Sequence, residues 1–285
     1  MQTQKSTQCA ARVVLRDDAG RGAWERLDWR PSVSRAAYER ALATIRSRIR
    51  EGDTYQVNFT YRLRACHTID PWSLFLRLAG GGEAPFAAFI DTGELAVCSA
   101  SPELFLRIDG ERIESRPMKG TTARGLWSED DQTRKAALLD SEKERAENVM
   151  IVDMVRNDLG RVADPGCVEV PALFTAEAYP AVWQMTSTVT ARTRAPLDQI
   201  LAAAFPPASI TGAPKGRAMS IIAELETEPR RIYTGTIGWL GPGRRSQWNV
   251  AIRTVLVHKP SQTVEYGVGG GIVWDSTPAG EYGES

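Results

Sequence analysis

The chain has 285 residues, of which 42% are hydrophobic and 25% are charged, so it has the composition of an ordinary globular protein with room for one large domain or two small ones. Its 35 basic and 35 acidic residues balance, and nothing in the charge indicates a nucleic-acid or anionic-membrane partner. The polar start and the lack of a long apolar run predict neither a signal peptide nor a membrane span, and the four scattered cysteines are typical of reduced thiols in the cytoplasm.

The N-terminal part of the chain gives weak signals at first and then a regular series of elements. Residues 1–33 are interpreted as an N-terminal remnant with room for one strand at 12–15, followed by a single domain over 34–285. Asp70 and Pro71 are typical of an N-cap and the first turn of a helix. The apolar spacing predicts a helix over 34–51, a helix from 71 that stops at 80, and strands over 57–64, 86–90 and 94–98.

Two short β-type runs, 104–108 and 112–118, are predicted to pair as a hairpin, because the Asp-Gly dipeptide between them is typical of a type I′ turn. An antiparallel pair would bring Glu103, before the first strand, next to Lys119, after the second. Gly120 would let the backbone approach a bound molecule closely. Lys119 is therefore a candidate nucleophile if burial favours its neutral form, and a solvated lysine on a surface hairpin is the alternative.

The second half of the chain has helices between groups of strands. The pattern predicts a polar loop over 124–131, helices over 132–159, 197–205 and 214–226, and strands over 168–174, 183–193, 233–240, 247–258, 263–268 and 272–274, with the glycines of 269–271 interrupting the last two. This order favours an α+β architecture with antiparallel sheets over a regular βαβ fold. No linker typical of a domain boundary is present, which indicates one domain.

Acidic residues mark a candidate metal site. Glu147 shares a helix face with an apolar stripe, and Glu144 lies one turn earlier; a carboxylate in that place is costly unless it meets a cation. Glu281 and Glu284 lie three residues apart near the end of the chain. With Glu147 they would form an all-oxygen site that suits Mg²⁺. The alternatives are a solvated helix edge for Glu144 and a frayed acidic terminus.

Three further features suit anions. Residues 209–215 precede a helix, and free backbone N–H groups, a hydroxyl and a lysine together suit a carboxylate or phosphate. The glycines within 267–271 could hold an anion through their amides or permit a β-bulge. Arg253 lies in an alternating strand and is either a structural ion pair or a bidentate carboxylate clamp.

The ordered motifs of the chain resemble those of chorismate-utilising enzymes. These motifs are SASPELFL, RPMKGT, ERAENVMIVDMVRNDLGR, VWQMTSTV, SITGAPKGRAM, IGWLG, NVAIRT and YGVGGGIVWDS. The resemblance covers 34–285 and makes that range the expected chorismate-binding catalytic domain. It implies an orthogonal two-sheet β-sandwich flanked by helices, chorismate as the substrate and Mg²⁺ as the cofactor.

The resemblance also assigns roles to three residues. It makes Lys119 the nucleophile that first attacks the chorismate ring, at a position where anthranilate synthases carry alanine. It makes Glu103 the acid that helps the ring hydroxyl leave. Isochorismate and salicylate synthases carry a lysine base at the position of Gln56, so a glutamine there disfavours water activation and makes ammonia the expected final nucleophile.

The remaining roles implied by the resemblance concern the metal and the substrate. Glu147 and Glu284 match metal-binding glutamates, with Glu281 and Glu144 as nearby support. Two positions depart from the family pattern, since many relatives have histidine at Gln184 and tyrosine at Trp239. The expected substrate-binding residues are Gly120, Thr211, Arg253, Gly270, Gly271, Trp239 and Gln184.

These roles favour one reaction, the conversion of chorismate and ammonia to 4-amino-4-deoxychorismate for para-aminobenzoate and folate synthesis. Ammonia is expected from a glutamine amidotransferase subunit, because the chain has no plausible Cys-His-Glu triad. A lyase, fused or separate, is an expected further partner. The alternatives are anthranilate synthase component I and a non-catalytic chorismate-binding module, and a turnover assay combined with chorismate titration separates them.

Overall fold

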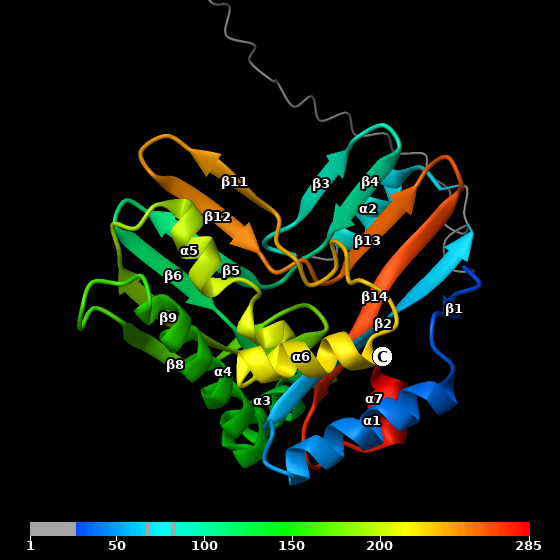
Figure 1. The fold of residues 1–285 in the computed structure, drawn as a ribbon, viewed down its shortest axis with the longest axis horizontal. Coiled ribbons are helices and arrows are strands. Elements are labelled where there is room, and N and C mark those ends of the chain that lie inside the picture. The colour runs from blue at the N-terminus through cyan, green and yellow to red at the C-terminus, as the bar shows by residue number, and fades with distance from the viewer. Residues whose placement is uncertain (1–26, 67–68, 81–83) are drawn as a thin grey trace, which may run out of the picture.

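The computed structural model describes residues 27–66, 69–80 and 84–285, and the strand expected at 12–15 lies outside these ranges. One antiparallel sheet has seven strands in these ranges, and its path runs β1-β2-β14-β13-β4-β3, with β10 beside β2 (Figure 1). Their bounds are β1 (Arg30–Pro31), β2 (Gln56–Cys66), β3 (Ala88–Asp91), β4 (Leu95–Ser99), β10 (Gly212–Ala213), β13 (Thr254–His258) and β14 (Thr263–Ile272).

The second sheet is also antiparallel and follows the path β11-β12-β5-β6-β9-β7, with β8 on the other edge of β9. Pro117 separates β6 from β7, and these two strands lie end to end along β9. The bounds are β5 (Leu104–Asp109), β6 (Arg112–Arg116), β7 (Met118–Ala123), β8 (Glu169–Ala178), β9 (Val182–Arg192), β11 (Gly238–Gly241) and β12 (Arg245–Asn249).

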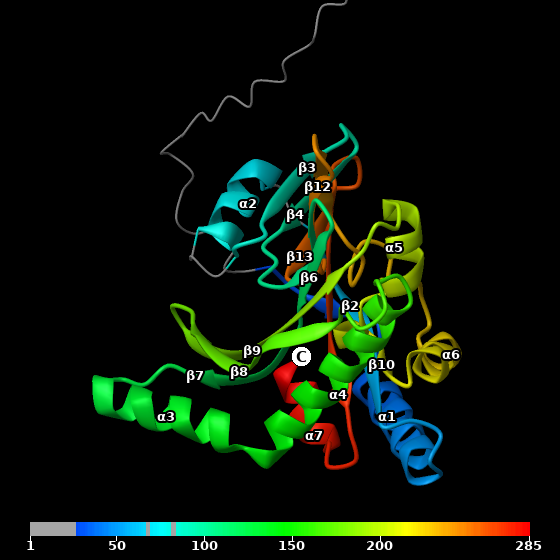
Figure 2. The same cartoon turned by 90° about the vertical axis from the view of Figure 1, so that its left-hand side faces the viewer.

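Helices cover both sheets. They are α1 (Arg35–Arg50), α2 (Pro71–Ala79), α3 (Ser128–Asp140), α4 (Glu142–Gly160), α5 (Leu197–Ala204), α6 (Lys215–Leu225), α7 (Pro278–Glu284) and a 3₁₀ turn, η1 (Ala208–Ile210). In Figure 1, α7 lies beside α1 below β2 and β14, and Figure 2 shows α2 outside β3 and β4. The architecture of two sheets flanked by helices confirms the expected fold class.

Two cores hold the helices against the sheets. Tyr38 and Leu42 of α1 pack with Phe59 of β2 because their helical spacing and the alternation of the strand present matching apolar faces. Ile151 and Val155 of α4 pack against the second sheet in the same way. The side chain of Asp70 caps α2 by accepting a hydrogen bond from the amide of Ser73, as the sequence predicted.

The long helix predicted over 132–159 is in fact two helices. Ser141 has an extended ψ of 112°, which ends α3, and its side chain accepts a hydrogen bond from the amide of Glu144, which caps α4. The predicted polar loop over 124–131 is also partly wrong, since α3 already begins at Ser128.

Three strand predictions were also wrong in detail. The strand over 247–258 is divided into β12 and β13, and Arg253 stands between them with a left-handed φ of 50°. Only β11 forms within 233–240, whereas β14 continues through the glycines of 269–271, paired with β2 throughout. Pairing of Asp109 with Arg112 leaves a two-residue loop in which only Gly110 has a positive φ, so the turn is not type I′.

No helix within the described ranges has the length and apolar character needed to cross a membrane. Among the described cysteines, Cys66, Cys98 and Cys167 are free thiols, as expected from their scatter, and Cys9 lies outside the described residues.

Candidate functional site

A polar cavity of about 610 Å³ gathers most of the residues that the sequence singled out. It is lined by β2, β7, β14, α4 and α7, together with the segments before β5 and β13. The predicted site residues on its wall are Glu103, Lys119, Gly120, Glu144, Glu147, Gln184, Arg253, Gly270, Gly271 and Glu281.

Glu103 is the one buried charged side chain among the described residues that line the cavity, with 4% exposed. Burial raises the pKa of its carboxyl from 4.5 to about 7, although the Ser209 hydroxyl, the positive charge of Lys119 and the backbone N–H of Met118 oppose the rise. Its backbone is fixed, because its carbonyl accepts a hydrogen bond from the amide of Val250. A carboxyl of this kind is partly protonated at neutral pH and can act as a general acid.

Lys119 meets Gln56 at a glycine of β14. A Cβ atom on Gly271 would lie 1.9 Å from Nε2 of Gln56 and 3.0 Å from Nζ of Lys119, so only glycine leaves room for both side chains. The buried Oε1 of Gln56 has no hydrogen-bond partner among the described residues. On the backbone side, Nδ2 of Asn148 in α4 donates to the carbonyl of Lys119 at 3.5 Å.

Carboxylates face Lys119 from α4 and α7. Burial and the negative charges of Glu144 and Glu281 raise the pKa of Glu147, while the positive charge of Lys119 lowers it. Oε2 of Glu144 lies 3.0 Å from where a Cβ on Gly120 would stand. This side of the cavity therefore concentrates negative charge.

The described residues contain no group of three or more acidic, cysteine or histidine side chains arranged to hold a metal ion. The side chain of Glu284 lies outside what the structure describes. Mg²⁺ is commonly bound through one or two carboxylates with water and substrate rather than by a complete protein cage. Glu147 and Glu281 supply carboxylate oxygens of that type, so the residues present fit an ion of this kind.

Arg253 reaches the cavity wall from the loop between β12 and β13 instead of from a strand. Its charge is close enough to oppose the rise that burial causes in the pKa of Tyr266. Gln184 is tied to β7, because its Nε2 donates to the carbonyl of Gly120 at 2.7 Å and its Oε1 accepts from Oγ1 of Thr121 at 2.8 Å. Gln184 thus holds the strand that carries Lys119.

Two expected substrate-binding residues are not on the cavity wall. Thr211 is buried, and its hydroxyl donates to the carbonyls of Pro207 and Ala208. Trp239 lies in β11, and 54% of it is exposed. The side chain of Thr211 therefore packs in the interior, and that of Trp239 lies at the protein surface.

Other cavity residues escaped the sequence reasoning. Asn58 and Thr60 line the wall on the same strand face as Gln56, and the alternation of β2 is the signal that could have found them. Ser209 also lines the wall, beside Glu103, and it is the first residue of the 209–215 segment that the sequence had marked as a candidate anion site.

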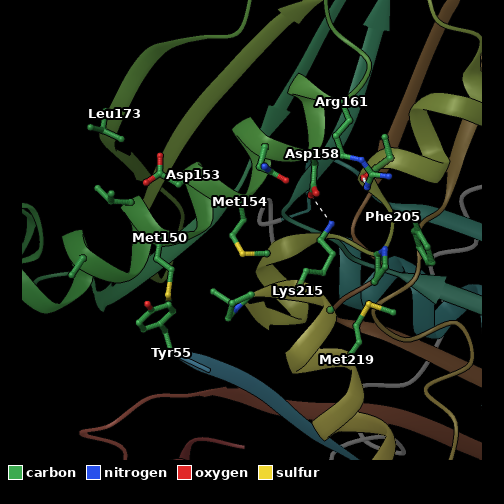
Figure 3. Close-up of a pocket in the computed structure, with 18 of the residues that line it drawn as sticks. Tyr55, Met150, Asp153, Met154, Asp158, Arg161, Leu173, Phe205, Lys215 and Met219 are labelled. Atoms are coloured by element: carbon green, nitrogen blue, oxygen red, sulfur yellow. Dashed lines mark hydrogen bonds and ion pairs between the residues drawn. The ribbon is translucent and has the colours of Figure 1, made fainter. Parts of the chain in front are cut away.

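A larger open groove, of about 1290 Å³, lies along other faces of α4 and α6 (Figure 3). Tyr55, Met150, Leu173, Phe205 and Met219 give it an apolar character. It contains none of the expected catalytic, substrate-binding or metal-binding residues, and Lys215 of the candidate anion segment 209–215 is paired with Asp158 there. We therefore place the chemistry in the polar cavity.

Comparison with known proteins finds curated relatives of this chain. Aminodeoxychorismate synthase component 1 of Klebsiella aerogenes is 45% identical over 259 residues, which are 90% of this chain and 57% of that protein. Anthranilate synthase component 1 1 of Haloarcula marismortui is 41% identical, over 88% of this chain and 52% of its own length. The chain therefore spans about half the length of these curated relatives.

The crystal structure of anthranilate synthase component I from Streptococcus pneumoniae TIGR4 has the same fold, with a TM-score of 0.85 and 32% identity over 94% of this chain and 59% of that one. Residues 2–285 match the family described as chorismate binding enzyme. Because that match extends over nearly the whole chain and the fold agrees with it, this chain belongs to the chorismate binding enzyme family.

Proposed function

We propose that this chain carries the chorismate-aminating activity of an aminodeoxychorismate synthase, which exchanges the ring hydroxyl of chorismate for an amino group. The observation that carries the proposal is that Glu103 and Lys119 line one cavity, while the buried side chain of Gln56 approaches Lys119 at Gly271. It joins an acid with a pKa near neutrality, an amine and an amide that cannot act as a base toward water. Similarity to relatives named aminodeoxychorismate synthase supports the same reaction.

The proposed reaction has two displacement steps. The neutral amine of Lys119 forms a C–N bond to the ring while the ring double bonds shift and the C–O bond of the hydroxyl breaks. Glu103 donates a proton, so the hydroxyl leaves as water. Ammonia then bonds to the carbon that carried the hydroxyl, the bond to Lys119 breaks, and the Glu103 carboxylate takes up the surplus proton.

Chorismate is a dianion, and the cavity offers matching groups. The guanidinium of Arg253 can bind a carboxylate through two parallel hydrogen bonds. Gly120, Gly270 and Gly271 leave the backbone open to close approach by the substrate. These residues are the proposed carboxylate-binding part of the site.

Glu147 and Glu281 are the proposed ligands of Mg²⁺, with Glu144 beside them and Glu284 next on α7. When bound, the ion would anchor the ring carboxylate and draw off negative charge as the double bonds shift. Burial and, to a lesser degree, repulsion from Glu144 and Glu281 raise the pKa of Glu147, and a cation held there would offset that repulsion.

A glutamine amidotransferase subunit is the proposed source of ammonia, and a lyase, fused or separate, is the proposed consumer of the product. The Klebsiella relative is itself called component 1. The test of the first partner is glutamine-dependent turnover. Glutamine should support turnover only when such a subunit is present, whereas ammonium should support turnover without it.

The decisive experiment is product identification. Purified protein is incubated with chorismate, Mg²⁺ and ammonium, and the product is identified by chromatography and mass. We expect 4-amino-4-deoxychorismate. Anthranilate or isochorismate as the main product would reject the proposal in favour of another reaction, and tight chorismate binding in calorimetry without any turnover would indicate a binding module.

A second experiment tests the covalent step at Lys119. Intact-protein mass spectrometry after incubation with chorismate and Mg²⁺, without ammonium, should detect a chorismate-derived adduct that maps to Lys119 and is absent in Lys119→Ala. Lys143→Ala is the matched control, since Lys143 is an exposed lysine on the same cavity wall. An adduct that persists in Lys119→Ala, or that is lost in both variants, would contradict the assigned nucleophile.

A further inference from the structure

The β7 strand bulges at the residue that carries the proposed nucleophile. Between the regular pairs on either side, Lys119 and Gly120 stand opposite a single residue of β9, Met185. A bulge of this kind bends the strand and redirects its side chains. Gly120 permits the bend, because its φ of 93° lies in the left-handed region that glycine adopts readily. The direction of the Lys119 side chain therefore depends on what fixes the bulge.

Two side-chain amides hold the backbone carbonyls of the bulge. The carbonyl of Gly120 accepts a hydrogen bond from Nε2 of Gln184 at 2.7 Å, and the carbonyl of Lys119 accepts a longer one from Nδ2 of Asn148 at 3.5 Å. A bulge leaves its extra residue outside the regular ladder, so side-chain donors are needed there. Gln184 belongs to the neighbouring strand, whereas Asn148 belongs to α4. Asn148 therefore links the bulge to the helix that also carries Glu147.

The side chain of Asn148 is itself fixed from the other side. It is buried, with 1% exposed, and its Oδ1 accepts a hydrogen bond of 2.6 Å from the hydroxyl of Ser187 in β9. The Ser187 hydroxyl also accepts from the amide of Phe174, and the amide of Ser187 donates to the carbonyl of Pro117. Because Ser187 is anchored in this way, the amide of Asn148 is held in one orientation, with Nδ2 directed at the carbonyl of Lys119.

We propose that Asn148 is a positioning residue for Lys119, and that it sets the bulge so that the amine points into the polar cavity beside Gln56. Asn148 does not line the cavity, so it acts through the backbone of Lys119 and not on the substrate. Its neighbour Glu147 does line the cavity, so one turn of α4 places both the amine and a proposed metal ligand. The inference rests on the proposed function, because the direction of Lys119 affects a rate only if its amine attacks the ring.

The kinetic test is Asn148→Leu, which keeps a branched side chain but removes its donor and acceptor. The rate constant for formation of the chorismate adduct, followed by intact-protein mass spectrometry, should fall roughly tenfold or more, because a displaced nucleophile loses its alignment. The calorimetric Kd for chorismate should remain that of wild type. Asn157→Leu is the matched control, because Asn157 is an exposed asparagine on the same helix. A wild-type adduct rate in the folded Asn148→Leu protein, or an equal loss of chorismate binding, would overturn the inference.

A second variant, Ser187→Ala, tests the same link without changing Asn148 and decides the matter if Asn148→Leu does not fold. It releases the amide of Asn148, so the adduct rate should fall in the same direction. Crystal structures of the variants give a readout that needs no chemistry. The amine of Lys119 should leave its place beside Gly271, while α4 and β9 keep their wild-type positions. An amine that stays in place would overturn the inference, whereas a wild-type protein that forms no adduct would reject the proposed function and leave the crystals to decide.

Discussion

Glu103→Gln should make the protein more stable at alkaline pH while it removes the proton donor. The folded state raises the pKa of Glu103 from 4.5 to about 7, so it holds this proton more tightly than the unfolded chain does. The resulting stability is fully present below pH 4.5 and is lost as the pH rises through 7. At 1.36 kcal/mol for each pKa unit, the loss of stability is about 3 kcal/mol at pH 8, where the carboxyl is ionised in both states, and about 1 kcal/mol at pH 5, where mainly the unfolded chain ionises it. Glutamine has nearly the same shape and no charge, and it avoids this cost.

The assay is urea unfolding of wild type and Glu103→Gln at pH 5 and pH 8. The stability of the variant relative to wild type should increase by about 2.5 kcal/mol between the two pH values, while its turnover falls sharply. Glu94→Gln, at an exposed glutamate, is the control and should show no such change. The same pH dependence in wild type and Glu103→Gln would refute the reasoning, since the carboxyl would then titrate as it does in water.

Three other variants test the packing around the site. Gly271→Ala should abolish formation of the chorismate adduct without unfolding the protein, because its Cβ would collide with the amide of Gln56; an adduct at the wild-type rate in mass spectrometry would contradict this. Glu147→Gln should weaken the dependence of turnover on Mg²⁺, and a Mg²⁺ titration identical to that of wild type would place the ion elsewhere. Lys215→Met should lower the free energy of unfolding by about 3–5 kcal/mol, because it leaves the buried charge of Asp158 without its partner; a loss below about 1 kcal/mol in urea unfolding would show that the pair is not buried in solution.

The sequence by itself determined the features that depend on neighbouring residues. The cap at Asp70 and the alternation of β2 follow from hydrogen bonds and side-chain directions within a few positions. The meeting of Glu103 with Lys119 could also be predicted, because a hairpin brings its own ends together. A short turn fixes the register of the two strands that it joins, so this register depends only on residues that are close in the sequence.

Only the tertiary structure decided what burial and distant segments impose. The register against β9 ends β6 at Pro117. The break of the long helix at Ser141 is different, because the cap on the amide of Glu144 is a local signal that the apolar pattern had obscured. Arg253 takes a left-handed conformation between two strands that the alternation had joined. Periodicity could not show this, because it records which residues are apolar and not where the backbone turns.

The chemical state of the site likewise needed the fold. A glycine is needed at position 271 only because the side chains of Gln56 and Lys119 approach it from other strands. No spacing in the sequence encodes the distances between these three residues. The pKa of Glu103 depends on the removal of water by segments far along the chain, including the loop that carries Ser209. The residue types were enough to identify a candidate acid and a candidate amine. The pKa of the acid lies near neutrality only because the folded chain removes water from it, and this desolvation depends on the three-dimensional arrangement.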